Sequence, residues 1–249
     1  MIFYFSGAGN SRHVAKQIAA VGEELVFIPN AVDQGIYEYR VAPGESVGLV
    51  FPVYFWTMPS IVAEFFQKLN LVSESKPYTY CVCTYGNTPG AAAKMASRVL
   101  KDNGIVFDAY FGVRMPDTWT PLFDLTDKEQ VAEVNLRADE EIARLRDAVC
   151  SKVTGNHLRS TTPYFTGALG KRLYDRQGRR TDTLSVDDAC IGCGLCAVKC
   201  PVHAIEMRDG RPVWVKERCV MCLGCLHRCP KFAIQRGPKT KLHGQYVHE

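Results

Sequence analysis

Short apolar runs alternate with amphipathic stretches along the first 150 residues. The runs are rich in β-branched and aromatic side chains and predict five strands, at residues 1–5, 24–29, 46–54, 78–85 and 105–113. Between the runs, apolar positions recur every three or four residues, as they do on one face of a helix. This alternation is typical of an α/β fold in which a parallel sheet carries helices on both faces.

The helix predicted after the fifth strand has the clearest start signal. Thr126 and Glu129 have the spacing of a capping box, and apolar positions then recur as far as Val149. Five strands with their helices complete a doubly wound domain, which we place at residues 1–150.

Residues 151–182 are more basic than the predicted domain that precedes them. We interpret this segment as a connector with one helix around residues 165–176. Basic side chains outnumber acidic ones, and a solvated face and a docking site for an acidic partner both fit this pattern. The basic residues are Lys152, Arg159, Lys171, Arg172, Arg176, Arg179 and Arg180, against Asp175 and Asp182.

An internal repeat follows the connector. CIGCGLCAVKCPVHAIE, from Cys190, aligns without gaps with CVMCLGCLHRCPKFAIQ, from Cys219, at an offset of 29 residues. Eight cysteines match, as do a proline, an alanine and an isoleucine in each copy. Two copies of one unit therefore form a second domain, at residues 183–236.

Each copy of the repeat reads CxxCxxCxxxCP, the spacing of bacterial ferredoxin motifs. In such motifs three close thiolates hold one [4Fe-4S] cluster, and the fourth cysteine crosses to the other cluster. Zinc is the alternative, but it is usually bound by CxxC pairs separated by a longer loop. We therefore expect two ligand sets: Cys190, Cys193, Cys196 and Cys229 for one cluster, and Cys219, Cys222, Cys225 and Cys200 for the other.

The turn after the first strand, FSGAGNSRH, has the composition of a phosphate-binding loop. A dinucleotide fingerprint needs a third glycine where Arg12 stands, and a Walker A loop needs a Gly-Lys pair that is absent. What remains is a turn of small and polar residues at a helix N-terminus, where backbone N–H groups and the helix dipole attract phosphate.

FSGAGNS resembles the FSGTGNS loop of flavodoxins, which wraps the FMN phosphate; Ala8 stands where the resemblance predicts Thr. The resemblance implies strand order 2-1-3-4-5, with FMN between the first and third strands. Residues 114–124, which follow the fifth strand, are a candidate third wall or a lid. For the aromatic residues, core or surface packing is the alternative to flavin contact. The implied FMN-binding residues are Ser6, Gly7, Ala8, Gly9, Asn10, Ser11, Pro52, Val53, Tyr54, Phe55, Trp56, Thr84, Tyr85, Gly86 and Asn87.

Taken whole, the chain resembles flavodoxin-ferredoxin fusion proteins: a flavodoxin-like domain with a doubly wound five-stranded parallel sheet, then a C-terminal α+β two-[4Fe-4S] ferredoxin domain. Residues 237–249 are expected to be a flexible tail. The resemblance implies FMN, two clusters and electron transfer with redox protein partners. A flavin reductase of a small acceptor, such as a quinone or nitro compound, is the alternative. No protein side chain is expected to act as a nucleophile.

Composition narrows the remaining options. A net charge of +4 over 249 residues gives no argument for nucleic acid binding. The N-terminus lacks the pattern of an export signal and no apolar run is long enough to span a bilayer, so we expect a cytoplasmic location. Oligomeric state stays open, a homodimer included.

Overall fold

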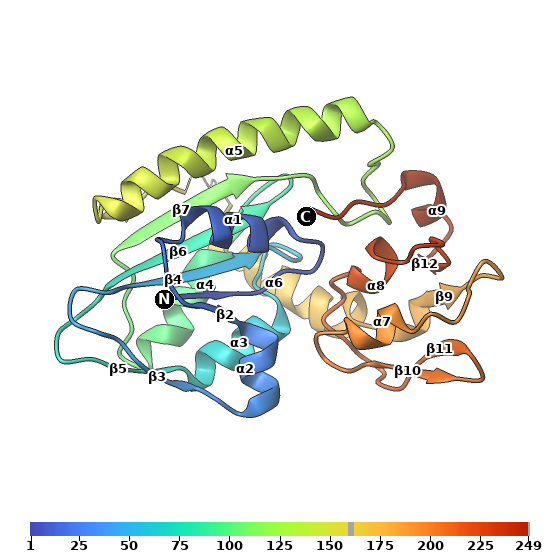
Figure 1. Cartoon of the computed structure of the whole chain (residues 1–249), viewed down its shortest axis with the longest axis horizontal. Coiled ribbons are helices and arrows are strands. Elements are labelled where there is room, and N and C mark those ends of the chain that lie inside the picture. The colour runs from blue at the N-terminus through green and yellow to red at the C-terminus, as the bar shows by residue number, and fades with distance from the viewer. Residues whose placement is uncertain (159–161, 249) are drawn as a thin grey trace.

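The computed structural model describes residues 1–158 and 162–248, so Arg159 of the basic connector lies outside the described residues. In this part of the chain, six parallel strands form the main sheet in the order β2-β1-β4-β6-β7-β8 (Figure 1). The predicted order 2-1-3-4-5 is confirmed, because the five predicted strands correspond to β1, β2, β4, β6 and β7. Strand β8 adds a sixth strand at the edge. The strands are β1 Ile2–Tyr4, β2 Leu25–Phe27, β4 Ser46–Pro52, β6 Tyr78–Tyr85, β7 Ala109–Arg114 and β8 Gly155–Asn156.

Several strand boundaries differ from the sequence prediction. The second run is only three residues of strand, because Pro29 lies in the first turn of helix α2 (Ile28–Gln34). The fifth run becomes strand only from Ala109. Two exposed residues form β8, and a separate parallel pair joins β3 (Glu38–Arg40) to β5 (Asn70–Val72). Strands of two or three residues are too short to show an alternating apolar pattern in the sequence.

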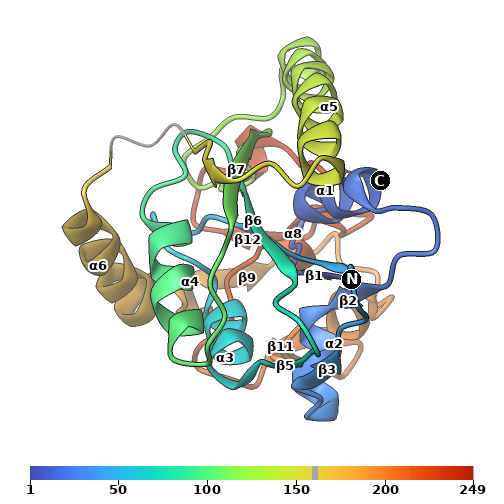
Figure 2. The ribbon, with the colours of Figure 1, turned by 90° about the vertical axis from the view of Figure 1, so that its left-hand side faces the viewer.

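Helices cover both faces of the sheet, as predicted. One face packs against α1 (Asn10–Ile18) and α5 (Lys128–Cys150), and the other against α2, α3 (Ser60–Lys68) and α4 (Ala92–Lys101) (Figures 1 and 2). The predicted capping box of α5 is wrong: the side chain of Asp127 accepts the Gln130 N–H at 2.9 Å. Asp127 thus takes the cap position one residue after Thr126.

The cysteine repeat folds into a small second domain at one end of the sheet (Figure 1). Each copy contributes a short helix and the strand that follows it, and the two strands join different antiparallel pairs, β10-β11 and β9-β12. The elements are β9 Leu184–Val186, α7 Leu195–Val198, β10 Ile205–Arg208, β11 Arg211–Trp214, α8 Gly224–His227 and β12 Ile234–Arg236.

The connector packs between the two domains. Its helix α6 spans Tyr164–Leu173 and continues into a wide turn at Tyr174–Gly178. Tyr174 is 1% exposed, and its hydroxyl donates to the Val220 carbonyl at 2.6 Å. A residue of the connector is thereby fixed to the loop that carries the second cysteine motif.

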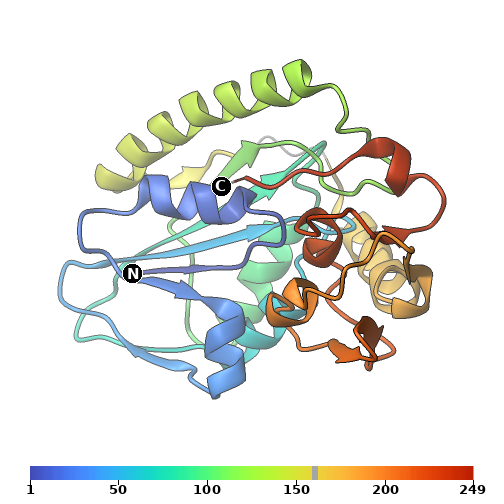
Figure 3. The same cartoon turned by 45° about the vertical axis from the view of Figure 1, so that its right-hand side comes forward.

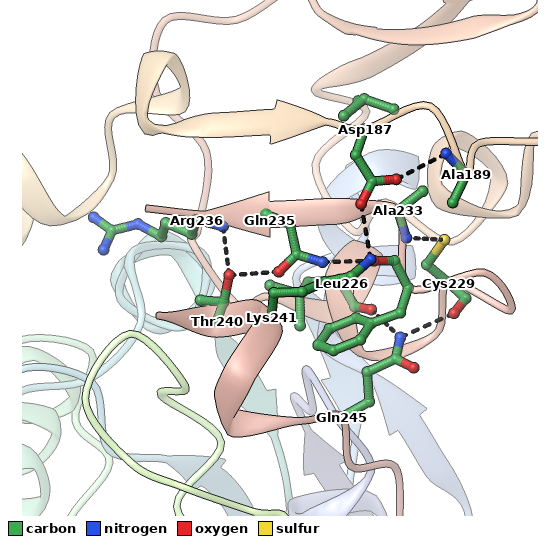
Figure 4. A network of polar contacts seen from close by, with 12 residues as sticks. Asp187, Ala189, Leu226, Cys229, Ala233, Gln235, Arg236, Thr240, Lys241 and Gln245 are labelled. Carbon is green, nitrogen blue, oxygen red and sulfur yellow. Dashed lines mark hydrogen bonds and ion pairs between the residues drawn. The ribbon is translucent and has the colours of Figure 1, made fainter. Parts of the chain in front are cut away.

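The C-terminal segment is not the flexible tail that its polar composition suggests. After helix α9 (Thr240–His243), the chain crosses back to the N-terminus of α1 (Figures 1 and 3). Gln245 donates to the carbonyls of Leu226 and Cys229 (Figure 4), and the His248 N–H donates to the Ala8 carbonyl at 2.8 Å. We call residues 244–248 the C-terminal strap, because they tie the second domain to the first.

No helix in the described ranges is both long and apolar enough to cross a membrane.

Tyr246 is the anchor of the strap. It is 8% exposed, and its hydroxyl donates to Asn135 of α5 at 2.9 Å. Tyr246→Ala is expected to lower the free energy of unfolding by about 3 kcal/mol, through the cavity left by a buried aromatic ring. Tyr246→Phe, the control, loses only the hydroxyl bond and about 1 kcal/mol. Urea unfolding followed by tryptophan fluorescence measures both; an unchanged midpoint for Tyr246→Ala contradicts the packed strap.

Candidate cofactor sites

A cavity of about 340 Å³ lies at the carboxyl ends of β1, β4 and β6. This is the point where the strand order reverses, and open α/β sheets bind ligands there. Its size is within the range of ligand pockets. Of the fifteen predicted FMN-binding residues, all but Gly9 line it: Ser6, Gly7, Ala8, Asn10, Ser11, Pro52, Val53, Tyr54, Phe55, Trp56, Thr84, Tyr85, Gly86 and Asn87.

The loop at residues 6–11 is stabilised by a hydrogen bond within the loop and by one to a residue of β6. The Ser6 hydroxyl accepts the Gly9 N–H at 3.1 Å, and the Ser11 hydroxyl lies 2.7 Å from that of Thr84. Asn10 donates to the Pro116 carbonyl, whereas its side-chain oxygen is buried with no hydrogen-bond partner among the described residues. Buried polar atoms are seldom left so. A loop of small residues at a helix N-terminus fits a phosphate-bearing ligand. The unused Asn10 oxygen, an acceptor, suits a hydroxyl or N–H donor of such a ligand instead of its phosphate.

Gly9 supports this loop from behind the cavity. Its φ of 109° is open to glycine but not to other residues, and a Cβ there would collide with the carbonyl oxygen of His248. The C-terminal strap therefore rests directly on the predicted phosphate loop.

The aromatic loop after β4 is a tight turn with unusual backbone angles. Tyr54 and Thr57 exchange two backbone hydrogen bonds of 2.9 Å, and the residues between them, Phe55 and Trp56, have φ of 50° and 61°. Such turns usually carry Asn-Gly. Placing two aromatic residues there costs on the order of 1–3 kcal/mol each, and strain of this kind is typical of ligand sites.

The aromatic rings of this turn occupy different surroundings. Tyr54 is packed edge-on against Phe5 and Tyr174, and burial raises its pKa well above the ordinary value. Phe55 packs between Trp119 and Tyr174, with ring centroids 5.2 Å and 5.7 Å away. Trp56 is 44% exposed at the cavity mouth. The aromatic residues of the turn therefore line the cavity, and two of them, Tyr54 and Phe55, also pack against other aromatic rings.

The segment after β7 forms the third wall, as the sequence suggested for residues 114–124. Pro116, Asp117, Thr118, Trp119, Leu122 and Phe123 line the cavity. The predicted set of binding residues omitted five further lining residues, Thr88, Tyr174, Met221, Cys222 and Leu223. The last three belong to the second cysteine motif, and no local signal connects that motif, or Tyr174, to the first domain.

The eight repeat cysteines gather in the two predicted sets. One small cavity is lined by Cys190, Cys193, Cys196 and Cys229, and another by Cys200, Cys219, Cys222 and Cys225. We call these the outer and inner quartets. Within the described ranges, no three such ligands converge on the position of a single metal ion. Four thiols around a common cavity are compatible with the ligand set expected for an iron-sulfur cluster.

Backbone amides point at the quartet sulfurs. The N–H groups of Ala204, Met221 and Ala233 donate to the Sγ atoms of Cys200, Cys219 and Cys229 at 3.1–3.3 Å. Hydrogen bonds to sulfur are one of the means by which proteins tune a cluster. Burial raises the pKa of the Cys222 thiol to about 12, so cluster assembly has to drive deprotonation at this site.

The two histidines near the motifs are engaged elsewhere. His227 is buried: its Nε2 lies 2.8 Å from the Thr118 carbonyl and its Nδ1 accepts the Tyr246 N–H, so both ring nitrogens are used. His203 pairs with Asp33 on the surface at 3.1 Å. Neither is placed as a cluster ligand, and His227 instead joins the second domain to the third wall of the cavity.

The inner quartet and the first cavity share a wall. Cys222 lines both. A Cβ on Gly7 would lie 2.7 Å from the Cys222 carbonyl oxygen and 2.8 Å from both the Cys222 Cβ and the Tyr54 hydroxyl. Arg228 donates to the Gly7 carbonyl. Because only a glycine permits this approach, the predicted phosphate loop and a cluster-binding loop are in direct contact.

Asp117 is the one carboxylate that lines the cavity in the described part of the chain. It accepts the Trp119 N–H at 3.0 Å and abuts Gly86, while Arg114 donates to the Gly86 carbonyl. Burial raises the pKa of Asp117. Its ionised form therefore costs folding free energy above the ordinary carboxyl pKa of about 4, and that cost disappears as the pH falls below it.

Asp117→Asn keeps the oxygen that accepts the Trp119 N–H and removes the charge. The variant is expected to have a higher urea midpoint than the wild type at pH 7, with the two midpoints converging at low pH, below the ordinary carboxyl range. Glu140→Gln, an exposed change on α5, is the control and should shift neither. A lower midpoint for Asp117→Asn at pH 7 contradicts a destabilising buried charge.

Comparison with known proteins agrees with this architecture. A flavodoxin domain family matches residues 1–142, more than half of the chain, and a 4Fe-4S dicluster domain matches residues 189–234. No curated protein matches the chain. Among solved structures, the Trp repressor binding protein of Bacillus subtilis is 10% identical (TM-score 0.36), over 61% of this chain and 96% of that one. The flavodoxin of Streptococcus pneumonia TIGR4 is 14% identical (TM-score 0.31), over 57% and 97%.

Proposed function

This chain belongs to the flavodoxin domain family and carries a 4Fe-4S dicluster domain, and on that premise we propose that it is an electron-transfer protein coupling FMN to two [4Fe-4S] clusters within one chain. One observation carries the proposal: Cys222 of the inner quartet lines the cavity formed by the FMN loops. An exchange of electrons between the two sites then needs no second copy of the chain.

When bound, FMN supplies two-electron chemistry and each cluster supplies one-electron chemistry. The side chains bind and position these groups. The loop at residues 6–11 holds the phosphate, the turn at residues 54–57 and the segment at residues 116–123 enclose the ring, and eight thiolates bind the clusters. None of these side chains forms a nucleophile-base pair.

The two quartets differ in position. The inner quartet lies against the first domain at Gly7, and Tyr174 and Arg179 of the connector bond to the carbonyls of Val220 and Cys219. The outer quartet lies away from the FMN cavity and includes the exposed Cys193. This arrangement supports an order in which the inner cluster exchanges electrons with the flavin and the outer cluster exchanges them with a protein on its own side of the molecule.

A flavin reductase of a small acceptor, such as a quinone or nitro compound, is the second candidate. Trp56 and Leu122 line the cavity and are 44% and 64% exposed, so its mouth is open to solvent. Steady turnover with a reduced donor and a panel of acceptors separates the two functions. Marked preference for one acceptor supports a reductase, and equally slow reduction of every acceptor supports a carrier.

The coupling is tested by removing one cluster at a time from the loaded protein. Cys225→Ser is expected to lose the inner cluster and Cys193→Ser the outer cluster, each retaining about half of the iron. After flash photoreduction, the slow transfer phase between cluster and flavin absorbance should fall at least about tenfold in Cys225→Ser and persist in Cys193→Ser. Equal rates in the two variants, at equal iron and FMN content, contradict the proposed order.

Ala8 tests the FMN loop separately. It lines the cavity where a flavodoxin loop carries threonine. Ala8→Thr is expected to lower the dissociation constant of FMN about fivefold, because one added hydrogen bond contributes about 1 kcal/mol. Ala8→Val, with the same shape and no hydroxyl, should not bind more tightly. Fluorescence titration of the flavin-free protein measures both, and equal affinity in the two variants excludes a hydroxyl contact.

A further inference from the structure

Helix α6 of the connector is held closely on one face. A Cβ on Gly167 would collide with Ala91 at the start of α4, and one on Gly170 would collide with the Phe55 carbonyl. Figure 2 shows α6 beside α4. The glycine face thus fixes α6 against α4 and against the aromatic turn of the FMN cavity.

The opposite face of α6 is apolar and open. Phe165, Leu169 and Leu173 follow one another at four-residue intervals and are 71%, 57% and 39% exposed. Residues at that spacing lie on one side of a helix. An exposed apolar stripe of this kind marks an interaction site more often than does a lone exposed leucine.

Positive charge surrounds the stripe. Helices α4 and α6 carry five basic residues and no acidic one, so that their charge exceeds the +4 of the whole chain. Lys171 pairs with Asp175; in the described ranges the other four form no ion pair. By contrast, α5 carries six acidic and four basic residues. The five basic residues of α4 and α6 are Lys94, Arg98, Lys101, Lys171 and Arg172.

The helix that carries this stripe adjoins the FMN cavity on its glycine face. Trp56, 44% exposed, lies 3.1 Å from the position of a Gly170 Cβ, and its turn lines the cavity on the other side. Tyr174, which follows α6 directly, also lines the cavity. A protein bound on the outer faces of α4 and α6 is therefore separated from the predicted flavin site by α6 and the turn at residues 54–57.

We propose that the outer faces of α4 and α6 form a docking surface for an acidic one-electron carrier protein. An apolar centre with a basic rim suits a partner whose own redox centre is ringed by carboxylates, since charge complementarity steers association. In each encounter the partner's centre loses one electron and the chain's cofactors gain one, and no bond is made or broken. The electron-transfer part of this inference rests on the proposed function.

The probe is a purified acidic plant-type [2Fe-2S] ferredoxin, and the first measurement is its binding in the oxidised form by isothermal titration. Lys94→Glu/Arg172→Glu is expected to weaken binding to the loaded protein at least tenfold at low salt. The control, Arg144→Glu/Arg146→Glu, makes the same change in net charge on exposed positions of α5 and should stay within twofold. Equal weakening by both pairs overturns the docking surface, because net charge alone then explains the loss.

The apolar stripe is tested by Phe165→Ser, which changes a side chain that is 71% exposed and leaves the glycine face intact. Binding should weaken several-fold; unchanged binding overturns the proposed apolar centre. Vesicles containing phosphatidylserine test a membrane instead of a protein: sedimentation of the wild type with them, lost in Lys94→Glu/Arg172→Glu while ferredoxin binding is unaffected, also overturns the proposal.

A stopped-flow measurement with the reduced ferredoxin separates this inference from the proposed function. Docking on α4 and α6 predicts that the second-order rate falls with added salt in the wild type and becomes nearly independent of salt in Lys94→Glu/Arg172→Glu. Binding that depends on these residues without any electron transfer leaves the docking surface standing and removes the proposed function. Transfer that is equally fast in both proteins removes the docking surface alone.

Discussion

The contact between Gly7 and Cys222 is the constraint on which the rest of the structure depends. A side chain at residue 7 would lie within 2.8 Å of the loop that holds the inner quartet, so the two domains can meet only where the first has no Cβ. Arg228 then joins the same backbone by donating to the Gly7 carbonyl. A single glycine of the phosphate loop thus permits the approach of the cluster-binding domain.

Three further hydrogen bonds hold the second domain against the first. Tyr174 of the connector donates to Val220, His227 lies against the Thr118 carbonyl, and the strap places His248 on Ala8. Each joins a segment around the second cysteine motif to a wall of the FMN cavity. The second domain is too small to be stabilised by its own apolar core alone. Its fixed position therefore depends on these contacts as well as on cluster binding.

The sequence predicted those parts of the molecule that depend on local pattern. The strand order followed from a resemblance carried by the loop at residues 6–11, and the quartets followed from cysteine spacing. The parts that it missed depend on contacts distant in sequence. Tyr246 lies in a polar segment but is buried. Its hydroxyl donates to Asn135 and its N–H donates to His227, and both partners are more than fifteen residues away in the sequence. Similarly, Tyr174 shows no periodic signal.

Strain in the aromatic turn could not be predicted either. Nothing in the letters Phe55-Trp56 indicates two left-handed residues, since this conformation is imposed by the paired hydrogen bonds of Tyr54 and Thr57. Helix α6 packs against this turn, because its Gly170 contacts the Phe55 carbonyl. The connector, which the sequence marks only by its charge, is thus the support for one wall of the cofactor site.

Charge distinguishes the inner quartet from the outer one. Burial raises the pKa of the Cys219 and Cys222 thiols, and the guanidinium groups of Arg179 and Arg236 at Cys219 and of Arg228 at Cys222 offset only part of this effect. The same positive charges offset part of the cost of added negative charge on a cluster bound there. Arg228 and Arg179 reach these positions only because Gly7 and the connector hold the second domain against the first. The contact that joins the two sites therefore also places positive charge where a transferred electron would reside, beside the flavin cavity.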